Sequence, residues 1–284
     1  MFYKEKALKH LRKSLAINPT LIEANIFQIK FFLKDGKINE AKTQVLSSLS
    51  HSTDNSELLY LKSLIEFKEG QFKASASSIE KALEFNPNNV RMLEHSLSLC
   101  EKHGNLKEKL KVLQKLIELV DDKPEYYLEI ADIQYNRGLL EDAKVFFDLA
   151  LDFLPDNENC LIKVSRFYFE CYEDLKDQNR QKVFSLVRSL IKRILSLKKT
   201  NYEAKLILAE IYLKEDDVKP AYLLLKECFD ANYKRKKYLV KLHELGLLLE
   251  GFEISNKYVS SSLSQTDTAG IANYLEAKHY FKTK

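Results

Sequence analysis

The stretch from Leu59 to Asn89 reads LYLKSLIEFKEGQFKASASSIEKALEFNPNN, and it decides the fold. It places Gly70 between two segments of helical apolar periodicity, and Pro87 follows the second segment. Glycine supplies the positive φ that ends one helix and turns the chain into the next, and proline marks where the second helix must stop. This stretch therefore predicts a helical hairpin.

The same pattern recurs along the chain with one period. Turn glycines are spaced 34 residues apart, and prolines at twice that spacing keep a constant offset from them. Because the glycines and the prolines independently show the same period, the chain is predicted to be a repeat protein. The glycines are Gly36, Gly70, Gly104 and Gly138, the prolines are Pro19, Pro87 and Pro155, and two apolar columns with the same period are Leu15, Leu49, Leu83, Ile117, Leu151 and Phe31, Ile65, Leu99, Ile133, Phe167.

Small side chains occupy two further columns of the repeat. A small side chain lets two helices approach closely, as a stack of hairpins requires. The unit around Gly104 departs from this pattern, because Lys109 and Leu116 stand where the other units have small residues. The small columns are Ala7, Ala41, Ser75 and Ala143, and Ser14, Ser48, Ala82 and Ala150.

Composition agrees with an all-helical chain. The 284 residues include seven glycines and five prolines, about a third of average usage, which leaves little room for the turns of a β-sandwich or barrel. Apolar residues make up 45% and charged residues 30%, as in a folded, soluble protein. The sequence contains no run of apolar residues long enough to predict a transmembrane segment.

The stretches 59–89 and 125–157 resemble tetratricopeptide repeats, since the turn glycine, the small residues of both helices and the closing proline fall in register. The resemblance implies an all-α fold, a right-handed solenoid of antiparallel helix hairpins. The sequence departs from the family pattern in having no tryptophan, and Thr53 and Asp121 replace the proline. These substitutions weaken individual units without removing the period.

After Pro155 the phase of the repeat slips. Tyr172 stands in the next glycine position, and the unit from Asn201 to Tyr233 aligns only if about ten residues are inserted. With that offset Asp216 takes the turn position. We expect residues 1–19 to be the second helix of an incomplete repeat, 20–157 four regular repeats, 158–235 two further repeats with an insertion near 173–182, and 236–284 a degenerate repeat and a capping helix.

The N-terminal residues fit only the second helix of a unit, with Ala7, Ser14 and Pro19 in register. A helical face without a neighbouring hairpin needs another surface to cover it. The sequence predicts either further repeats before this helix or its docking against another chain, including self-association.

The resemblance also implies which residues line a concave groove formed by the first helices of successive hairpins. Large apolar groups there predict a groove for an extended or helical peptide, although they could instead pack half covered against the adjacent first helix. The carboxylates would favour lysine or arginine on the partner. The candidate partner-binding residues are Tyr60, Leu64, Phe67, Glu94, Glu101, Leu128, Asp132, Tyr135, Ile162, Arg166 and Phe169.

We therefore predict a non-catalytic scaffold or adaptor that holds a protein or peptide partner during complex assembly. No catalytic residues, metal site or cofactor are predicted, because the histidines are scattered and expected on the surface, and no phosphate loop or nucleophile elbow occurs. Four separated cysteines without a C-x-x-C motif indicate a reducing compartment. We expect a cytoplasmic protein or, alternatively, the soluble part of a cell-envelope-associated complex.

A second hypothesis is that the basic C-terminal half binds nucleic acid or an anionic surface. It lacks interleaved exposed aromatic residues that would stack on bases, so nucleic acid is not the expected partner. The basic residues concerned are Arg180, Lys182, Arg188, Lys192, Arg193, Lys198, Lys199 and residues 234–237.

Overall fold

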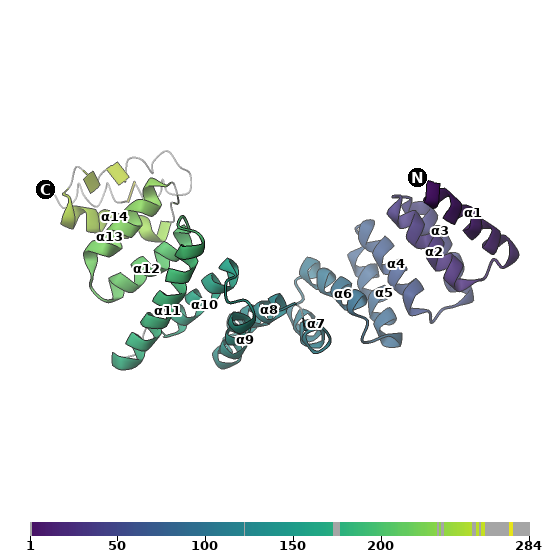
Figure 1. Ribbon diagram of the computed structural model, residues 1–284, viewed down its shortest axis with the longest axis horizontal. Helices are drawn as coiled ribbons and strands as arrows, with labels where there is room; N and C mark the ends of the chain where they lie inside the picture. Colours follow the sequence, from purple (N-terminus) through teal and green to yellow (C-terminus); the bar gives the residue numbers. More distant parts are fainter. Residues whose placement is uncertain are drawn as a thin grey trace. The chain divides into compact units, whose positions relative to one another are not determined.

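In the computed structural model, the residues described form α-helices joined by short turns, with no strand among them (Figure 1). The described residues are 2–121, 123–172, 177–231, 233, 236–251, 254–255, 257–258 and 273–274. The helices are α1 (Phe2–Ile17), α2 (Ile22–Lys34), α3 (Ile38–His51), α4 (Ser56–Lys68), α5 (Phe72–Phe85), α6 (Val90–His103), α7 (Leu106–Leu119), α8 (Glu125–Asn136), α9 (Leu140–Phe153), α10 (Glu158–Tyr172), α11 (Asp177–Leu197), α12 (Tyr202–Lys214), α13 (Val218–Asp230) and α14 (Lys236–Leu249).

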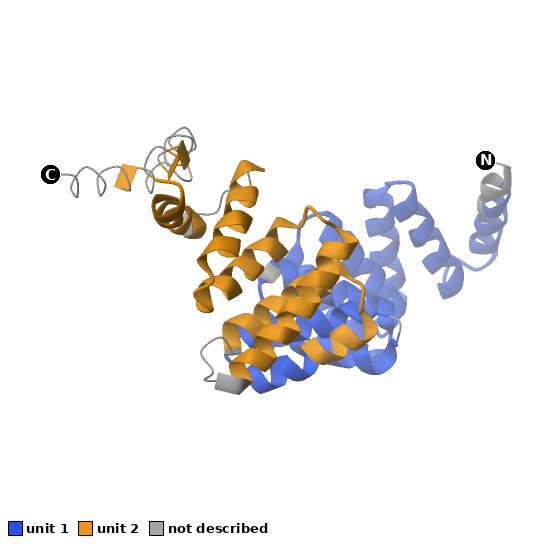
Figure 2. Ribbon diagram, turned by 60° about the vertical axis from the view of Figure 1, so that its left-hand side comes forward, with its two compact units in different colours: residues 1–146 blue, residues 147–284 orange. Residues whose placement is uncertain are grey.

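The chain divides into two compact units, residues 1–146 and 147–284 (Figure 2). In the first unit α2 packs on α3, α4 on α5 and α6 on α7, and each pair also contacts the next helix along the chain. In the second unit α10 packs on α11 and α12 on α13. The predicted fold class, an all-helical solenoid of antiparallel hairpins, is confirmed. The assignment of residues to individual repeats stays a prediction.

The turns within the hairpins have the left-handed backbone that the spacing predicts. Gly70 has a φ of 76°, and Gln71 donates its N–H to the carbonyl oxygen of Glu66 at 2.8 Å, which satisfies a carbonyl at the helix end. Asp216, assigned to a turn from the sequence, has a φ of 59° and is the non-glycine residue with positive φ in the described part of the chain. Gly36, Gly104 and Gly138 have φ values of 74°, 67° and 77°.

The small residues lie in the core, where they let the helices of a hairpin approach. Ser63 of α4 donates its hydroxyl to the carbonyl oxygen of Ser75 at 2.8 Å, and Ser75 of α5 donates to that of Ser63 at 2.7 Å. Ala131 of α8 and Ala143 of α9 stand 68 residues after Ser63 and Ser75 in the sequence and are completely buried. Such crossings hold the two backbones close together.

The hairpin of α6 and α7 is built differently. Leu97, Lys109 and Leu116 stand 34 residues after Ser63, Ser75 and Ala82, in that order. Leu97 and Leu116 are buried. The Nζ of Lys109 lies 2.7 Å from a carboxylate oxygen of Glu129. Larger side chains at the crossing need more space between the helices, so this hairpin cannot close as tightly as its neighbour.

Asparagine side chains cap several first helices, a column that the sequence analysis missed. The side chain of Asn55 accepts the N–H of Leu58 at 3.0 Å, and Asn89 accepts that of Met92 at 3.3 Å. Such caps satisfy N–H groups that have no partner within the helix. The same position before α8 is occupied by Lys123, which is free to make a contact outside its own helix.

Part of what the sequence predicts lies outside the described residues. Of the expected insertion, residues 173–176 fall outside them, and residues 177–182 form the first turns of α11, a helix of 21 residues. The predicted C-terminal capping helix is also outside them except for residues 273–274. In α1, Leu11 is buried whereas Ile17 is 86% exposed. All four cysteines are free thiols, and Cys228 is buried like a small apolar residue.

Candidate functional site: the face of the first helices

The candidate site in the first unit is the surface of α2, α4, α6 and α8, called here the first-helix face. Ion pairs join these helices to one another. A carboxylate oxygen of Glu57 on α4 lies 2.6 Å from the Nζ of Lys30 on α2 and 3.6 Å from Nη2 of Arg91 on α6. One carboxylate therefore links three successive first helices, and the surface they form is pre-arranged.

A second link joins α6 to the start of α8. Lys123 donates to the carboxylate of Glu94, and the hydroxyl of Tyr126 donates to the same carboxylate at 3.2 Å. The hydrogen bond from Lys123 lowers the pKa of Glu94, so that this side chain is ionised at neutral pH. Lys123, at the position where other first helices have a capping asparagine, thus connects the hairpin of α8 to α6.

An aromatic cluster occupies the middle of the face. Tyr60 and Phe67 of α4 pack edge-on against the ring of His95 of α6, with ring centroids 5.8 Å and 5.4 Å apart. Phe67 also meets Phe72 at 5.4 Å. Tyr60 and Phe67 are half-buried, so each covers a neighbour and also leaves an edge exposed. The packing against His95 agrees with the half-covered interpretation, and a role of these residues in binding a peptide stays a prediction.

His95 is buried, which corrects the expectation that the histidines lie on the surface. Its Nε2 is 2.9 Å from the hydroxyl oxygen of Ser63. Ser63 and Ser75 also bond each other's carbonyl oxygens, so the ring of His95 contacts the hydrogen-bonded crossing of α4 and α5. Burial lowers the pKa of His95, which favours the neutral ring. His243 in the second unit is buried as well.

The predicted acidic character of the face is reduced by pairing within the chain. Glu94 is bound by Lys123, and Glu101 lies 3.2 Å from the Nζ of Lys109. Burial disfavours the charged form of Lys109, but hydrogen bonds to Glu129 and Glu101 outweigh it and raise its pKa. A strongly basic partner is therefore less favoured than the carboxylates alone suggest.

The structure divides the other candidate residues by their burial. Leu64, Asp132, Tyr135 and Ile162 are half-buried and keep exposed surface. Leu128 is buried in the core, so it is not accessible to a partner. Phe27, which the sequence analysis did not select, is a large apolar residue of α2 that is 52% exposed. The sequence offers no clear signal for it, because α2 carries several other large apolar residues.

In the second unit the candidates take part in internal packing. Phe169 is buried and stacks on Phe184 of α11, with ring centroids 6.0 Å apart. Arg166 of α10 donates to the carboxylate of Glu203 of α12 at 2.8 Å. Phe169 is therefore not part of an exposed binding surface. Arg166 connects the first helices α10 and α12, as Glu57 connects first helices in the first unit.

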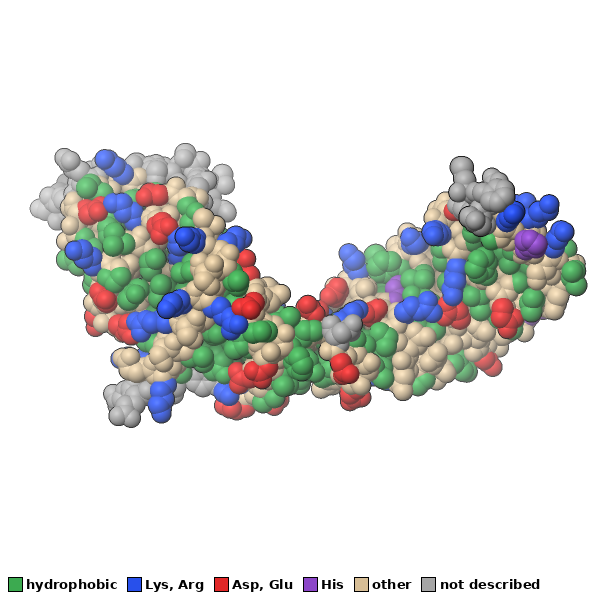
Figure 3. All heavy atoms as spheres, viewed as in Figure 1, with side chains coloured by type: hydrophobic (Ala, Val, Ile, Leu, Met, Phe, Trp, Pro, Cys, Tyr) green, Lys and Arg blue, Asp and Glu red, His purple; other side chains and the backbone are tan. Residues whose placement is uncertain are grey.

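Some of the basic residues of the second unit are paired with acidic neighbours. Arg188 pairs with Glu215, and Arg193 lies 2.7 Å from a carboxylate oxygen of Asp156. Figure 3 shows acidic and basic side chains interspersed over this part of the visible face. Lys234 and Arg235 lie outside the described residues. This pairing disfavours the nucleic-acid hypothesis, because phosphate binding needs a continuous basic surface.

No cluster of three or more side chains able to hold a metal ion occurs in the residues that the structure describes. Within the same residues, no helix combines the length and apolar character needed to cross a membrane.

Solved structures identify the fold. The C-terminal part of a tetratricopeptide repeat-containing protein from Cytophaga hutchinsonii superposes with a TM-score of 0.60 at 15% identity, covering 87% of this chain and 97% of that chain. The chain has a tetratricopeptide-repeat fold. YrrB, described as a tetratricopeptide repeat protein with an unusual peptide-binding site, superposes with a TM-score of 0.55 at 16% identity, covering 68% of this chain and 95% of its own.

A further match is the Naa15/Naa10 structure bound to HypK-THB, with a TM-score of 0.60 at 11% identity, covering 93% of this chain and 40% of the matched chain. Proteins of this fold generally mediate protein–protein interaction.

Sequence comparison gives distant relatives. No family model matches the chain. Human protein O-mannosyl-transferase TMTC1 is 23% identical over 161 residues, which cover 54% of this chain and 18% of the relative. The tetratricopeptide repeat and J domain-containing co-chaperone DNJ1 of Cryptococcus neoformans is 22% identical over 165 residues, which cover 54% of this chain and 32% of the relative. The chain spans less than a third of the length of these curated relatives.

Proposed function

We propose that this chain is a non-catalytic scaffold or adaptor that holds a protein partner on its first-helix face during complex assembly. The observation that carries the proposal is the contact of Glu57 with both Lys30 and Arg91, which joins three first helices into one surface. A surface already fixed before binding loses little conformational entropy when a partner docks, so more of the contact energy appears as affinity.

The chemistry of the face indicates what the partner offers. Tyr60, Leu64 and Phe67 lie along one side of α4 and are half-buried, so they supply apolar surface for an anchoring side chain. The neighbouring carboxylates Glu57 and Glu94 already have basic partners within the chain. We therefore propose that the partner binds mainly through apolar or aromatic anchors with polar contacts around them.

Proteins of the same fold support this proposal by analogy. YrrB has a peptide-binding site, and the Naa15/Naa10 structure is bound to HypK-THB. Each likeness establishes the fold alone, since identities lie between 11% and 16%. The surface proposed for this chain rests on its own residues.

Photo-crosslinking in the source cells tests the proposal. A benzoylphenylalanine at Ser98, an exposed residue of α6 on the first-helix face, should form a covalent adduct with a protein partner. The matched control carries the same group at Lys81, an exposed residue of α5. Adducts at Ser98 identify the partner by mass spectrometry. If Ser98 yields no adduct, the first-helix face does not hold the partner and the proposal is wrong.

A further inference from the structure

A cavity of about 510 Å³ lies between the second helices α5 and α7, with α6 beneath it. Apolar side chains form much of its lining, including Ile79 and Leu83 of α5, Leu93 of α6 and Val112 of α7. Its volume falls within the range of about 300–1,000 Å³ for ligand sites. We call it the outer groove.

The outer groove and the first-helix face use different sides of α6. Ser96 and Cys100 line the groove, whereas Glu94 and Ser98 belong to the first-helix face. Successive helical residues are about 100° apart, so Ser96 is about 160° from both Glu94 and Ser98 around the helix. A partner in the groove would therefore leave the first-helix face open.

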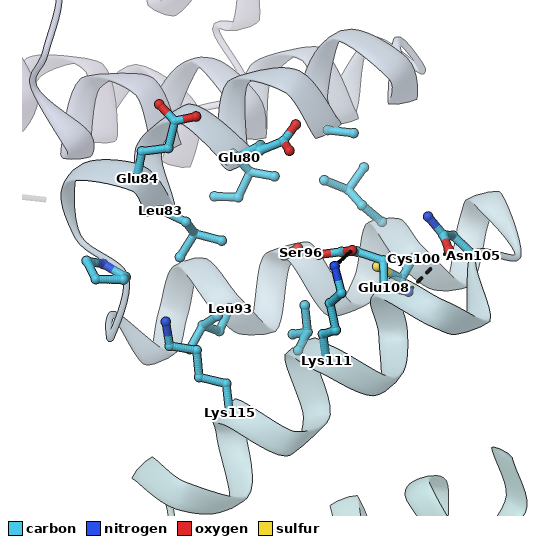
Figure 4. A pocket seen from close by; sticks show the side chains of 15 residues that line it. Glu80, Leu83, Glu84, Leu93, Ser96, Cys100, Asn105, Glu108, Lys111 and Lys115 are labelled. Carbon is cyan, nitrogen blue, oxygen red and sulfur yellow. Dashed lines mark hydrogen bonds and ion pairs between the residues drawn. The ribbon is translucent and has the colours of Figure 1, made fainter. Parts of the chain in front are cut away.

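The walls of the outer groove carry opposite charges. Glu80 and Glu84 stand on α5, and Lys111 and Lys115 stand on α7 across the groove (Figure 4). Lys111 is paired with Glu108 at 3.3 Å. Glu80, Glu84 and Lys115 have no ion-pair partner among the described residues, unlike the carboxylates Glu57, Glu94 and Glu101 of the first-helix face.

The departure of the third hairpin from the small-residue pattern explains why a groove opens here. Leu97 and Lys109 stand at the crossing of α6 and α7, where the preceding hairpin has Ser63 and Ser75 in direct hydrogen-bond contact. Larger side chains at this crossing require more space between α6 and α7. The larger residues Leu97 and Lys109, which depart from the repeat pattern, are thus consistent with open space beside α5.

The dimensions and lining of the groove favour a helical occupant. Its residues on α5 run from Ala76 to Glu84, about 12 Å along the helix and roughly two helical turns. An extended peptide needs backbone partners for its N–H and C=O groups, and helical walls have already used theirs. A helix satisfies its own backbone and presents a stripe of side chains, so it suits a groove between helices.

We propose that the outer groove docks an amphipathic helix of a partner protein. The apolar stripe of that helix packs on Ile79, Leu83 and Val112. One flank carries lysine or arginine against Glu80 and Glu84, and the other carries a carboxylate against Lys115. This makes the chain a scaffold with two independent binding surfaces, and the second does not depend on the partner of the first-helix face.

A displayed peptide library tests the docking of a helix directly. Peptides of about 14 residues, roughly four turns, carry a fixed apolar stripe and flanks that vary among lysine, glutamate and glutamine, and they are selected against the full chain. We expect the selected peptides to have one basic flank. Fluorescence anisotropy then measures their affinity for variants of the chain.

The double variant Glu80→Lys/Glu84→Lys should weaken binding about tenfold or more, because two attractions become repulsions. Both residues are exposed, so the fold is retained. Ala76→Arg, which fills one end of the groove, should abolish binding, and circular dichroism checks its folding. The matched control Glu118→Lys, an exposed change of α7 outside the groove, should alter affinity less than about twofold.

The proposal is overturned if no helix with a basic flank is selected, or if the selected helices bind the Glu80→Lys/Glu84→Lys variant as well as the parent chain. Loss of binding in Arg91→Glu instead would place the peptides on the first-helix face and would also overturn it. Failure of the groove leaves the crosslinking result at Ser98 unaffected, so the two proposals can fail separately.

Discussion

Replacing Gly70 by alanine tests whether the hairpin turns depend on left-handed backbone. Gly70 has a φ of 76°, and a methyl group added to it would meet no atom within 4 Å, so steric collision does not contribute. Alanine in the left-handed region costs about 1–2 kcal/mol. Alanine also lowers the conformational entropy of the unfolded chain, and this stabilises the folded state by about 0.4–1 kcal/mol. We therefore expect Gly70→Ala to destabilise the chain by about 1 kcal/mol.

Hydrogen exchange measured by mass spectrometry gives the local readout, because repeat proteins can open unit by unit. A loss of about 1 kcal/mol should speed exchange in α4 and α5 about fivefold. Lys68→Ala, an exposed change within α4, is the control and should stay within about 0.5 kcal/mol of the parent. In a continuous helix Gly70→Ala would stabilise by about 1 kcal/mol. Slower exchange in the variant would therefore refute the reasoning.

Three further predictions concern the first unit. Since burial lowers the pKa of His95 below its unfolded value, its contribution to stability is complete above about pH 6.5 and is lost as the pH falls through the folded pKa. The urea midpoint should be lower at about pH 5.5 than at about pH 7.5, and His95→Gln should reduce this difference; an unchanged difference would contradict it. Asn89→Ala removes the acceptor for the N–H of Met92 and should cost about 1 kcal/mol in urea unfolding, whereas an unchanged midpoint would show that the cap is unimportant. Lys109→Met leaves Glu129 without its 2.7 Å partner and should cost about 1 kcal/mol, while Lys109→Arg should retain most of the stability in the same melts.

The periodic part of the fold could be predicted because each marker has a local physical cause. Gly70 needs a positive φ, and Ala143 is small because two helices cross there. The turn at Asp216 could be predicted from its position in the repeat, although aspartate by itself does not indicate left-handed backbone. The asparagine caps Asn55 and Asn89 are also 34 residues apart, but asparagine is common in turns as well as at caps, so the residue type alone did not predict them.

The candidate site was harder to predict because its properties depend on contacts between hairpins. Glu57 and Glu94 read as available carboxylates in the sequence, but their basic partners come from neighbouring first helices or the turn before one. His95 was expected on the surface, yet the small residue Ser63 leaves room for its ring and lies within hydrogen-bond distance of its Nε2. Phe169 is buried by Phe184 of the long helix α11, whose length the regular repeat does not predict.

The small-residue columns also explain where the repeat can vary. The crossing of α4 and α5 is closed by reciprocal hydrogen bonds of Ser63 and Ser75, so a larger side chain there would break two bonds and separate the helices. In the next hairpin Lys109 takes the corresponding position, and its charge is balanced by Glu101 and Glu129. A repeat unit can therefore lose its tight crossing without unfolding when ion pairs compensate.

Hydroxyl-radical footprinting of the chain with its crosslinked partner tests the central claim most directly. Tyr60 and Phe67 lie on the first-helix face and keep exposed edges, whereas Phe85 of α5 is 52% exposed outside it. The account predicts that oxidation of Tyr60 and Phe67 falls when the partner is bound and that oxidation of Phe85 does not change. Unchanged oxidation of Tyr60 and Phe67 in the complex would contradict the assignment of this face as the binding surface.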